Sequence, residues 1–251
     1  MRDSPVRLPV VLVAHGSRDP RAAATTRALA RVVARLSPGS PVRVAFLDHA
    51  GPRVGEALRP FGADEVAVVP LLLTAAYHGR VDLPAALAEA RAAGIGTGAM
   101  LTDALGPTSS LVPAALLAGL RRRLAERGPG YDALVLAAAG TRDRAALSTV
   151  DQVATALGAA LGVPCRSGYA SAAAPTAGEA VRELCTAGAR RVAVAAYFLA
   201  TGRLYGSAAD SALAAGAVAV AEPLGDAPEL ARLVLDRVAQ ARTRSLVGAA
   251  R

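Results

Sequence analysis

Imidazole side chains are few in this chain of 251 residues, and they are clustered along it. The three histidines, His15, His49 and His78, all lie in the first third of the sequence. His15 directly follows the apolar run 8–14, and His78 lies in a loop beyond a second apolar run, 65–71. A neutral imidazole binds first-row divalent metals and exchanges protons near neutral pH. These positions point to a metal site or a site of proton transfer.

A carboxylate, Asp48, follows the second predicted strand just as the two histidines follow the first and the third. In an open parallel sheet, ligands bind beyond the carboxyl ends of the strands, where the loops converge. We therefore expect His15, Asp48 and His78 to lie at one edge of a sheet. A single histidine in such a place is more commonly a hydrogen-bonded structural residue. Two imidazoles and a carboxylate together suit a divalent first-row metal.

Residues beside these three could contribute to the same site. His49 would point away from Asp48 if the strand pleat continued through it, which predicts a surface or supporting residue, with direct metal contact as the alternative. Tyr77 could line a flat pocket or pack half-buried. Gly16 would let the backbone approach a ligand, and the helix amides behind it favour an anion. Arg18 has either a fold role or a ligand role, because an arginine recurs at the matching position of the second half.

Apolar stretches rich in Val and Leu alternate along the chain with Ala-, Arg- and Leu-rich stretches of helical period. This alternation is typical of parallel strands that crossover helices bury on both faces. Strands are predicted at 8–14, 41–47, 65–71, 98–102, 132–138, 164–170, 191–197 and 217–221. Helices are predicted at 20–36, 53–61, 82–93, 109–127, 143–161, 175–187, 205–215 and 227–243. Asp19 and Pro20 mark the first helix as its N-cap and first helical residue.

The second half of the chain repeats the first. Gly16-Ser-Arg-Asp19 recurs as Gly140-Thr-Arg-Asp143, and Gly55-Glu-Ala-Leu58 recurs as Gly178-Glu-Ala-Val181. We therefore predict an α/β fold of two similar lobes from an internal duplication, each a parallel sheet flanked by helices. The predicted lobes are 1–127, which carries the site, and 131–251.

The duplication allows one half to be compared with the other. At each candidate position the second half keeps the neighbouring Gly, Arg and Asp residues but lacks the ionisable side chain. The matched pairs are His15 with Ala139, Asp48 with Ser171, and His78 with Leu204. One active site, in the first copy, explains this difference.

Composition limits the classes of function. The formal charge is +8 and all 28 basic residues are arginine, which suits ligands that carry carboxylate or phosphate, although codon bias would give the same composition. No nucleic-acid-binding module is recognisable, so we expect no nucleic-acid partner. Cys165 and Cys185 form no Cys-x-x-Cys pair, so we expect buried free thiols rather than a zinc or iron–sulfur site. Without a signal peptide or an apolar run of about 20 residues, we expect a cytoplasmic protein with no membrane partner.

Three segments carry a family resemblance: Val13-Ala-His15-Gly-Ser-Arg-Asp-Pro20, Val44-Ala-Phe46-Leu-Asp-His-Ala-Gly-Pro52 and Pro70-Leu-Leu-Leu-Thr-Ala-Ala-Tyr-His78-Gly-Arg-Val-Asp82-Leu-Pro84. They resemble the sirohydrochlorin chelatases, the cobalt- and iron-inserting class II chelatases of cobalamin and sirohaem biosynthesis, in their long two-lobed form. The resemblance covers nearly the whole chain. It implies two class II chelatase-like lobes that face each other across a cleft, with metal held by histidines of one lobe.

The resemblance also implies roles for single residues. His15 and His78 carry over as metal ligands and as catalytic proton acceptors. The expected substrate-binding residues are Arg18, Tyr77, Gly16 and Asp48. The family often has Glu where this chain has Asp48, and a bridging water would fill the gap that the shorter side chain leaves. The substrates implied are a tetrapyrrole and Fe²⁺ or Co²⁺, with no organic cofactor.

Two other functions remain open. Ala14-His15-Gly16 superficially resembles the Arg-His-Gly of histidine phosphatases, but alanine stands where a phosphate-binding arginine belongs. A metal or tetrapyrrole carrier that does not catalyse insertion would use His15 and His78 in the same way. Because duplication already supplies a pseudo-twofold pair of lobes, we expect a monomer.

Overall fold

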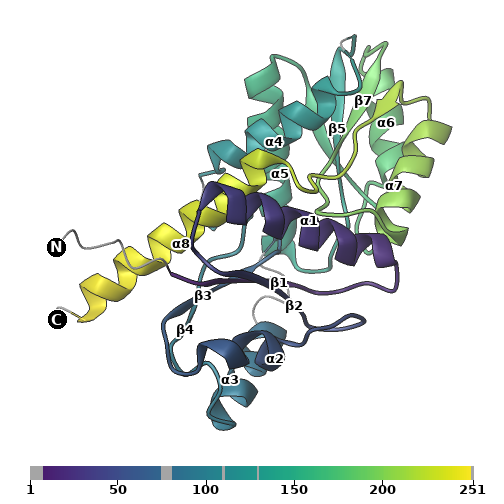
Figure 1. The fold of residues 1–251 in the computed structure, drawn as a ribbon. Helices are drawn as coiled ribbons and strands as arrows, with labels where there is room; N and C mark the ends of the chain where they lie inside the picture. The colour runs from purple at the N-terminus through teal and green to yellow at the C-terminus, as the bar shows by residue number, and fades with distance from the viewer. Residues whose placement is uncertain (1–7, 75–80, 109–110, 129, 250–251) are drawn as a thin grey trace. The chain divides into compact units, whose positions relative to one another are not determined.

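The computed structural model describes residues 8–74, 81–108, 111–128 and 130–249, and it divides into two compact units. Unit 1 takes its described residues from Met1–Leu72, Tyr77–Leu105 and Ala231–Arg251. Unit 2 takes its described residues from Leu73–Ala76 and Gly106–Leu230. Figure 1 shows the helices and strands of both units in colours that follow the chain.

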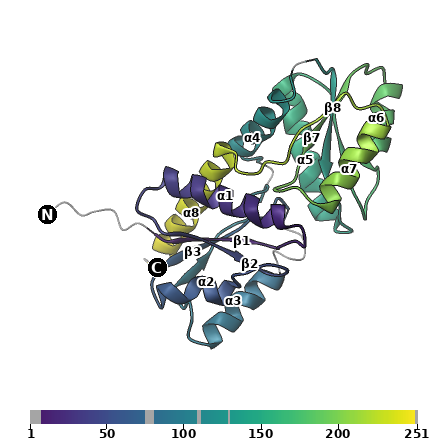
Figure 2. The same ribbon diagram turned by 45° about the vertical axis from the view of Figure 1, so that its right-hand side comes forward.

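Unit 1 is built on a parallel four-stranded sheet with the order β2-β1-β3-β4. Its strands are β1 (Val10–Ala14), β2 (Val42–Phe46), β3 (Val66–Pro70) and β4 (Ala99–Leu101). Its helices are α1 (Pro20–Leu36), α2 (Val54–Leu58), the 3₁₀ helix η1 (Arg59–Phe61), α3 (Leu83–Ala92) and α8 from Ala231 onward. Helices α2 and α3 cover one face of the sheet and α1 the other (Figures 1 and 2). The central strands β1 and β3 are therefore covered on both sides, as their apolar sequences predict.

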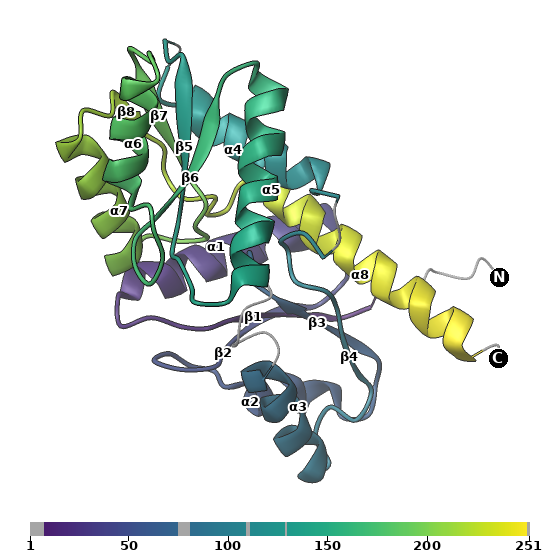
Figure 3. The same ribbon diagram turned by 180° about the vertical axis from the view of Figure 1, so that it is seen from behind.

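Unit 2 has a second parallel four-stranded sheet, with the order β6-β5-β7-β8. Its strands are β5 (Ala133–Ala138), β6 (Cys165–Tyr169), β7 (Val192–Ala196) and β8 (Ala219–Val220). Its helices are α4 (Ala114–Ala125), α5 (Arg144–Leu161), α6 (Ala177–Thr186), α7 (Arg203–Ala214) and the start of α8 (Pro228–Ala249). Figure 3 shows α6 and α7 on one side of this sheet and α4 and α5 on the other.

The two sheets share one strand order, with the first strand of each flanked by the second and the third. Backbone details recur as well. His49 and Ala172 have φ of 59° and 58°, and Gly16 and Gly140 have φ of +97° and +88°. These repeated features confirm the prediction of two parallel sheets flanked by helices.

The last helix of each repeat packs in the unit built mainly from the other repeat. Helix α4 lies in unit 2, where Arg122 pairs with Glu229 at 3.1 Å. The later part of α8 lies in unit 1, where Arg244 pairs with Asp103 at 2.8 Å. The compact units thus differ from the lobes 1–127 and 131–251, which the sequence repeat predicts.

The predicted helix starts have a local physical cause. Asp19 caps α1 by accepting a hydrogen bond from the Arg21 backbone N–H at 2.9 Å, and Pro20 follows as the first helical residue. Asp143 caps α5 in the same way, since its carboxylate accepts from the backbone N–H of Ala145 at 2.9 Å.

The cysteines are free, as predicted, but the expectation that both are buried is wrong. Cys165 is half-buried and Cys185 is exposed, because the latter lies on an outward position of α6. In the described part of the chain, no helix combines the length and the apolar character that crossing a bilayer requires.

Candidate functional site

The carboxyl ends of β1 and β2 bring two of the predicted site residues together. The strands are paired up to Ala14 and Phe46, and the pairing continues beyond them. The backbone N–H of Asp48 donates to the carbonyl oxygen of His15 at 2.7 Å. His15, which is half-buried, and Asp48 are therefore neighbours at one edge of the sheet, as their places after successive strands predict.

Gly16 permits this close approach. Its φ is +97°, and a Cβ atom built there would lie 1.8 Å from the carbonyl oxygen of Asp48. A Cβ atom built on Gly140 would likewise lie 1.8 Å from the carbonyl oxygen of Ser171. The space beside Gly16 is thus filled by the protein's own backbone, so both copies of the fold need glycine at this position.

The carboxylate of Asp48 is held in its ionised form. Its Oδ1 accepts a hydrogen bond from the His49 backbone N–H at 2.7 Å, and Arg53 Nη2 lies 3.7 Å from the same oxygen. The hydrogen bond is the largest cause that holds the pKa of Asp48 below its usual value. Desolvation opposes it, and the charges of His49, Arg53 and His15 each add a smaller lowering effect. This side chain therefore presents a negative charge beside His15 at neutral pH.

His49 does not follow the strand pleat. Strand β2 ends at Phe46, and His49 has a left-handed φ of 59°, so the pleat argument for an outward side chain does not apply. The rings of His15 and His49 meet edge to face with their centroids 6.4 Å apart. His49 Nε2 also lies 3.4 Å from Asp48 Oδ2. His49 thus contacts both residues of the site.

The second copy keeps this backbone without the ionisable side chains. Ala172 repeats the left-handed φ of His49, and the Ser171 N–H donates to the carbonyl oxygen of Ala139 at 3.1 Å. The fold therefore forms with alanine and serine at the positions of His15 and Asp48. What distinguishes the first copy is the chemistry of its side chains.

The remaining predicted residues divide into two groups. Arg18 is exposed in the turn that precedes α1. Tyr77 and His78 fall within residues 75–80, which lie outside the described part of the chain. Among the described residues, no group of three or more His, Cys, Asp and Glu side chains is arranged to hold a metal ion. The described site has one imidazole and one carboxylate at the strand ends, with His49 beside them.

Two arginines that the sequence interpretation missed hold the loop between β2 and α2. Arg27 Nη2 donates to the carbonyl oxygen of Gly51 at 3.1 Å, and Arg53 Nη1 donates to the carbonyl oxygen of Leu47. The internal repeat contained the signal for both. Their matched residues in the second copy are aspartate and threonine, at 151 and 176, so these arginines are specific to the copy that carries His15.

Comparison with known proteins places the chain in one family. A family model described as CbiX matches residues 9–122 and again residues 133–241. A sirohydrochlorin cobaltochelatase of Methanopyrus kandleri is 35% identical over 78 residues, which are 30% of this chain and 54% of that protein. A second, from Methanosarcina barkeri, is 30% identical over 81 residues, 31% of this chain and 62% of that protein. The matches thus span less than two thirds of these curated relatives.

Solved structures share the whole architecture. SirB from Bacillus subtilis with Fe³⁺ superposes with a TM-score of 0.80 at 22% identity, over 96% of this chain and 97% of that one. A structure described as CbiX, the terminal enzyme for biosynthesis of sirohaem in denitrifying bacteria, has a TM-score of 0.68 at 27% identity, over 93% and 99%. At its low identity, the likeness to SirB establishes the fold alone.

Proposed function

Because the chain belongs to the CbiX family, we propose that it is a sirohydrochlorin chelatase that inserts Fe²⁺ or Co²⁺ into its tetrapyrrole substrate. The observation that carries the proposal is the juxtaposition of His15 and Asp48 at the strand ends of the first copy. The second copy has the same backbone with Ala139 and Ser171, so the two ionisable side chains serve chemistry rather than folding.

Metal insertion needs a partly dehydrated ion and the removal of two pyrrole protons. A neutral imidazole can supply both functions, since one ring nitrogen binds a metal or accepts a proton near its usual pKa of about 6.5. We assign these functions to His15 and to His78, the residue predicted to complete the pair. The ionised carboxylate of Asp48 would attract the incoming cation directly or through a bridging water.

The tetrapyrrole is a flat molecule that carries many carboxylates. The excess of arginine, with a formal charge of +8, favours its approach. Arg18 and Gly16, which precede α1, and Tyr77, beside His78, are the proposed substrate-binding residues together with Asp48. Gly16 would contribute through its main chain, because the Asp48 backbone fills the space beside its Cα. No organic cofactor has a part in this scheme.

Either metal fits the proposed ligands. Imidazole and carboxylate accept Fe²⁺ and Co²⁺ alike, and metal availability decides between them in the cell. The product therefore belongs to sirohaem or to cobalamin biosynthesis, and we place the enzyme in the cytoplasm as a monomer with two similar lobes.

The direct test mixes the purified protein with sirohydrochlorin and Fe²⁺ or Co²⁺ and follows the absorbance change of metal insertion. We expect the wild type to exceed the uncatalysed rate and Asp48→Ala to be slower than the wild type. The matched control is Ser171→Ala, which truncates the equivalent side chain of the second copy and should retain full activity. No acceleration by the wild type would refute the proposal, and tight binding without acceleration would identify a carrier.

A further inference from the structure

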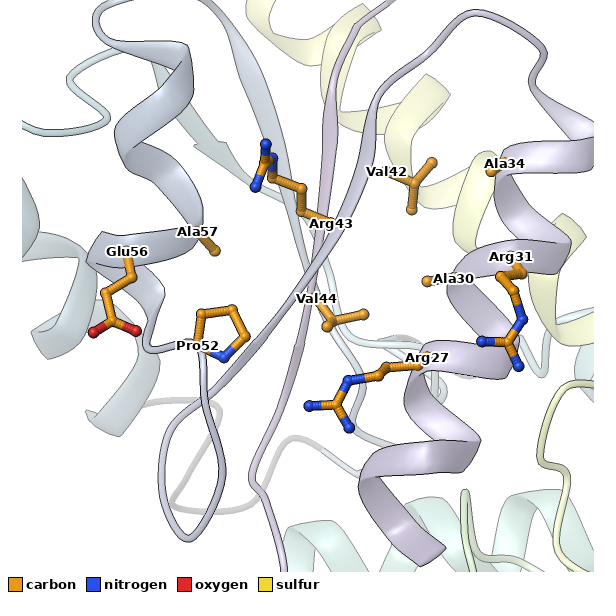
Figure 4. A pocket seen from close by; sticks show the side chains of 10 residues that line it. All are labelled: Arg27, Ala30, Arg31, Ala34, Val42, Arg43, Val44, Pro52, Glu56 and Ala57. Carbon is orange, nitrogen blue, oxygen red and sulfur yellow. The ribbon is translucent and has the colours of Figure 1, made fainter. Parts of the chain in front are cut away.

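A groove of about 410 Å³ follows the outer side of β2, the edge strand of the unit 1 sheet. Val42 and Val44 of this strand lie at its centre, with α1 on one side and α2 on the other (Figure 4). In the described part of the chain β2 is the last strand of the sheet on this side, so no further described strand fills the space. The volume lies within the range of small-molecule sites, about 300–1,000 Å³.

Three exposed arginines line the groove. Arg27 and Arg31 are four residues apart on α1, so they project from the same face of that helix (Figure 4). Arg43 projects from β2, and its guanidinium lies 5.8 Å from the centre of the Phe61 ring. Among the described residues that line the groove, Glu56 is the acidic one, and its carboxylate already accepts a hydrogen bond from the Arg53 backbone N–H at 2.8 Å. The groove therefore carries excess positive charge.

The second copy lacks two of these three arginines. The residues matched to Arg27 and Arg31 are aspartate and threonine, at 151 and 155. The residue matched to Arg43 is Arg166, which is paired with Glu183 at 3.1 Å. Exposed arginines are ordinarily no more than a solvated surface. Here three of them line one groove, and the fold of the other copy shows that packing does not require arginine at the positions of Arg27 and Arg31.

The groove also touches the loop that carries the candidate site. Pro52 lines the groove, and Arg27 holds the adjacent Gly51 carbonyl at 3.1 Å. The same loop begins at Leu47 and contains Asp48 and His49. A ligand that engages Arg27 would therefore act on the segment that positions the Asp48 carboxylate.

We propose that this groove is an anion site for a ligand that bears several carboxylates. Planar guanidinium groups bind carboxylates through paired hydrogen bonds, and three of them around one cavity favour a ligand with more than one acidic group. The valine side chains at the centre suit the carbon skeleton between those groups. Two sources provide this chemistry: a free polycarboxylate, or the tetrapyrrole itself, and the latter source rests on the proposed function.

The test compares the full-length wild type with the double variant Arg31→Gln/Arg43→Gln, which leaves the loop contact of Arg27 intact. Uroporphyrin, a metal-free tetrapyrrole with eight carboxylates, is titrated by fluorescence, and citrate is titrated by calorimetry. Loss of two charge-assisted contacts at an exposed site should weaken binding roughly tenfold. The control is Arg166→Gln/Arg182→Gln, which removes the same charge from unit 2 and should bind as the wild type does. Thermal unfolding followed by circular dichroism verifies that both variants fold.

The outcomes separate the two sources. If the groove variant, but not the control variant, loses affinity for uroporphyrin, the groove binds the carboxylates of the tetrapyrrole. If the groove variant loses affinity for citrate and not for uroporphyrin, the groove binds a free anion. Equal affinities of the wild type and the groove variant for both ligands, or an equal loss in the control, would overturn the proposal. Because no metal is present, failure of the chelatase assay would leave this result unaffected.

Discussion

The close approach of Gly16 to the Asp48 backbone can be tested by the substitution Gly16→Ala, which adds one methyl group and should affect both stability and metal insertion. In Gly16→Ala, the new Cβ atom would start 1.8 Å from the Asp48 carbonyl oxygen, a separation that has to reach at least 3.0 Å. An L-residue in a left-handed conformation costs about 1–2 kcal/mol. Moving the loop also weakens the hydrogen bond from Asp48 N to His15 O, which contributes about 0.5–1.5 kcal/mol. We therefore expect the free energy of unfolding to fall by about 1.5–3.5 kcal/mol.

The same displacement moves the Asp48 carboxylate relative to His15 by about 1 Å, and misplacement of this size costs roughly 10²-fold in catalysis. Urea unfolding measures the stability, and metal insertion measured where the variant is fully folded gives the activity. Gly140→Ala is the matched control, because its Cβ would also lie 1.8 Å from a carbonyl oxygen, that of Ser171. We expect it to lose similar stability and to keep its activity.

Two results would refute this reasoning. Wild-type stability of Gly16→Ala would mean that the two backbones do not approach as closely as the structure has them. Equal losses of activity in the folded Gly16→Ala and Gly140→Ala variants would mean that the first copy has no special part in the reaction.

The remaining predictions concern side chains of the site and the two thiols. His15→Ala should slow metal insertion roughly 10²-fold or more, as loss of an acid–base group does, and near-wild-type activity would remove His15 from the site. His49→Ala should cost much less in the same assay, and an equal loss would show that His49 acts directly on the metal or the substrate. Insertion should fall as the pH drops through about 6.5, because a protonated imidazole cannot bind metal, and a flat profile from about pH 5 to pH 8 would contradict imidazole ligation. Since the pKa of Asp48 is held below its usual value, its carboxylate stays charged through this range and stabilises a protonated imidazole beside it, so Asp48→Asn should lower the rate and move the inflection to lower pH. Burial raises the pKa of Cys165 to about 12, so a maleimide at neutral pH should modify Cys185 alone in the native protein, and rapid labelling of both thiols would contradict this burial.

Local signals in the sequence predicted most elements of the fold. Helix α1 occupies the predicted residues 20–36. Its start depends on local sequence alone, because Asp19 caps the helix and Pro20 is its first residue. The misses also have local causes. The helix predicted at 109–127 begins at Ala114, after Pro113, because proline disfavours helical conformation in the residue before it. The helix predicted at 53–61 gives way to a 3₁₀ turn where Pro60 lacks the N–H that an α-helix requires.

Chain order alone placed His15 and Asp48 together. Parallel strands present their carboxyl ends at one edge, so residues that follow two neighbouring strands become neighbours without any knowledge of packing. The internal repeat then showed that the second copy does without both side chains. The α/β class, the duplication and this pair of residues were therefore determined by the sequence itself.

Only the tertiary structure decided three further features. The turn after β2 gives His49 a left-handed backbone and brings its ring to His15, which strand periodicity does not predict. The exchange of α4 and α8 between the compact units depends on contacts between residues far apart in the chain. The arginine groove forms because α1 and β2, which are separate in sequence, direct Arg27, Arg31 and Arg43 around one cavity. The helix exchange and the groove depend on packing between segments that are distant in the chain, and the turn at His49 departs from strand periodicity.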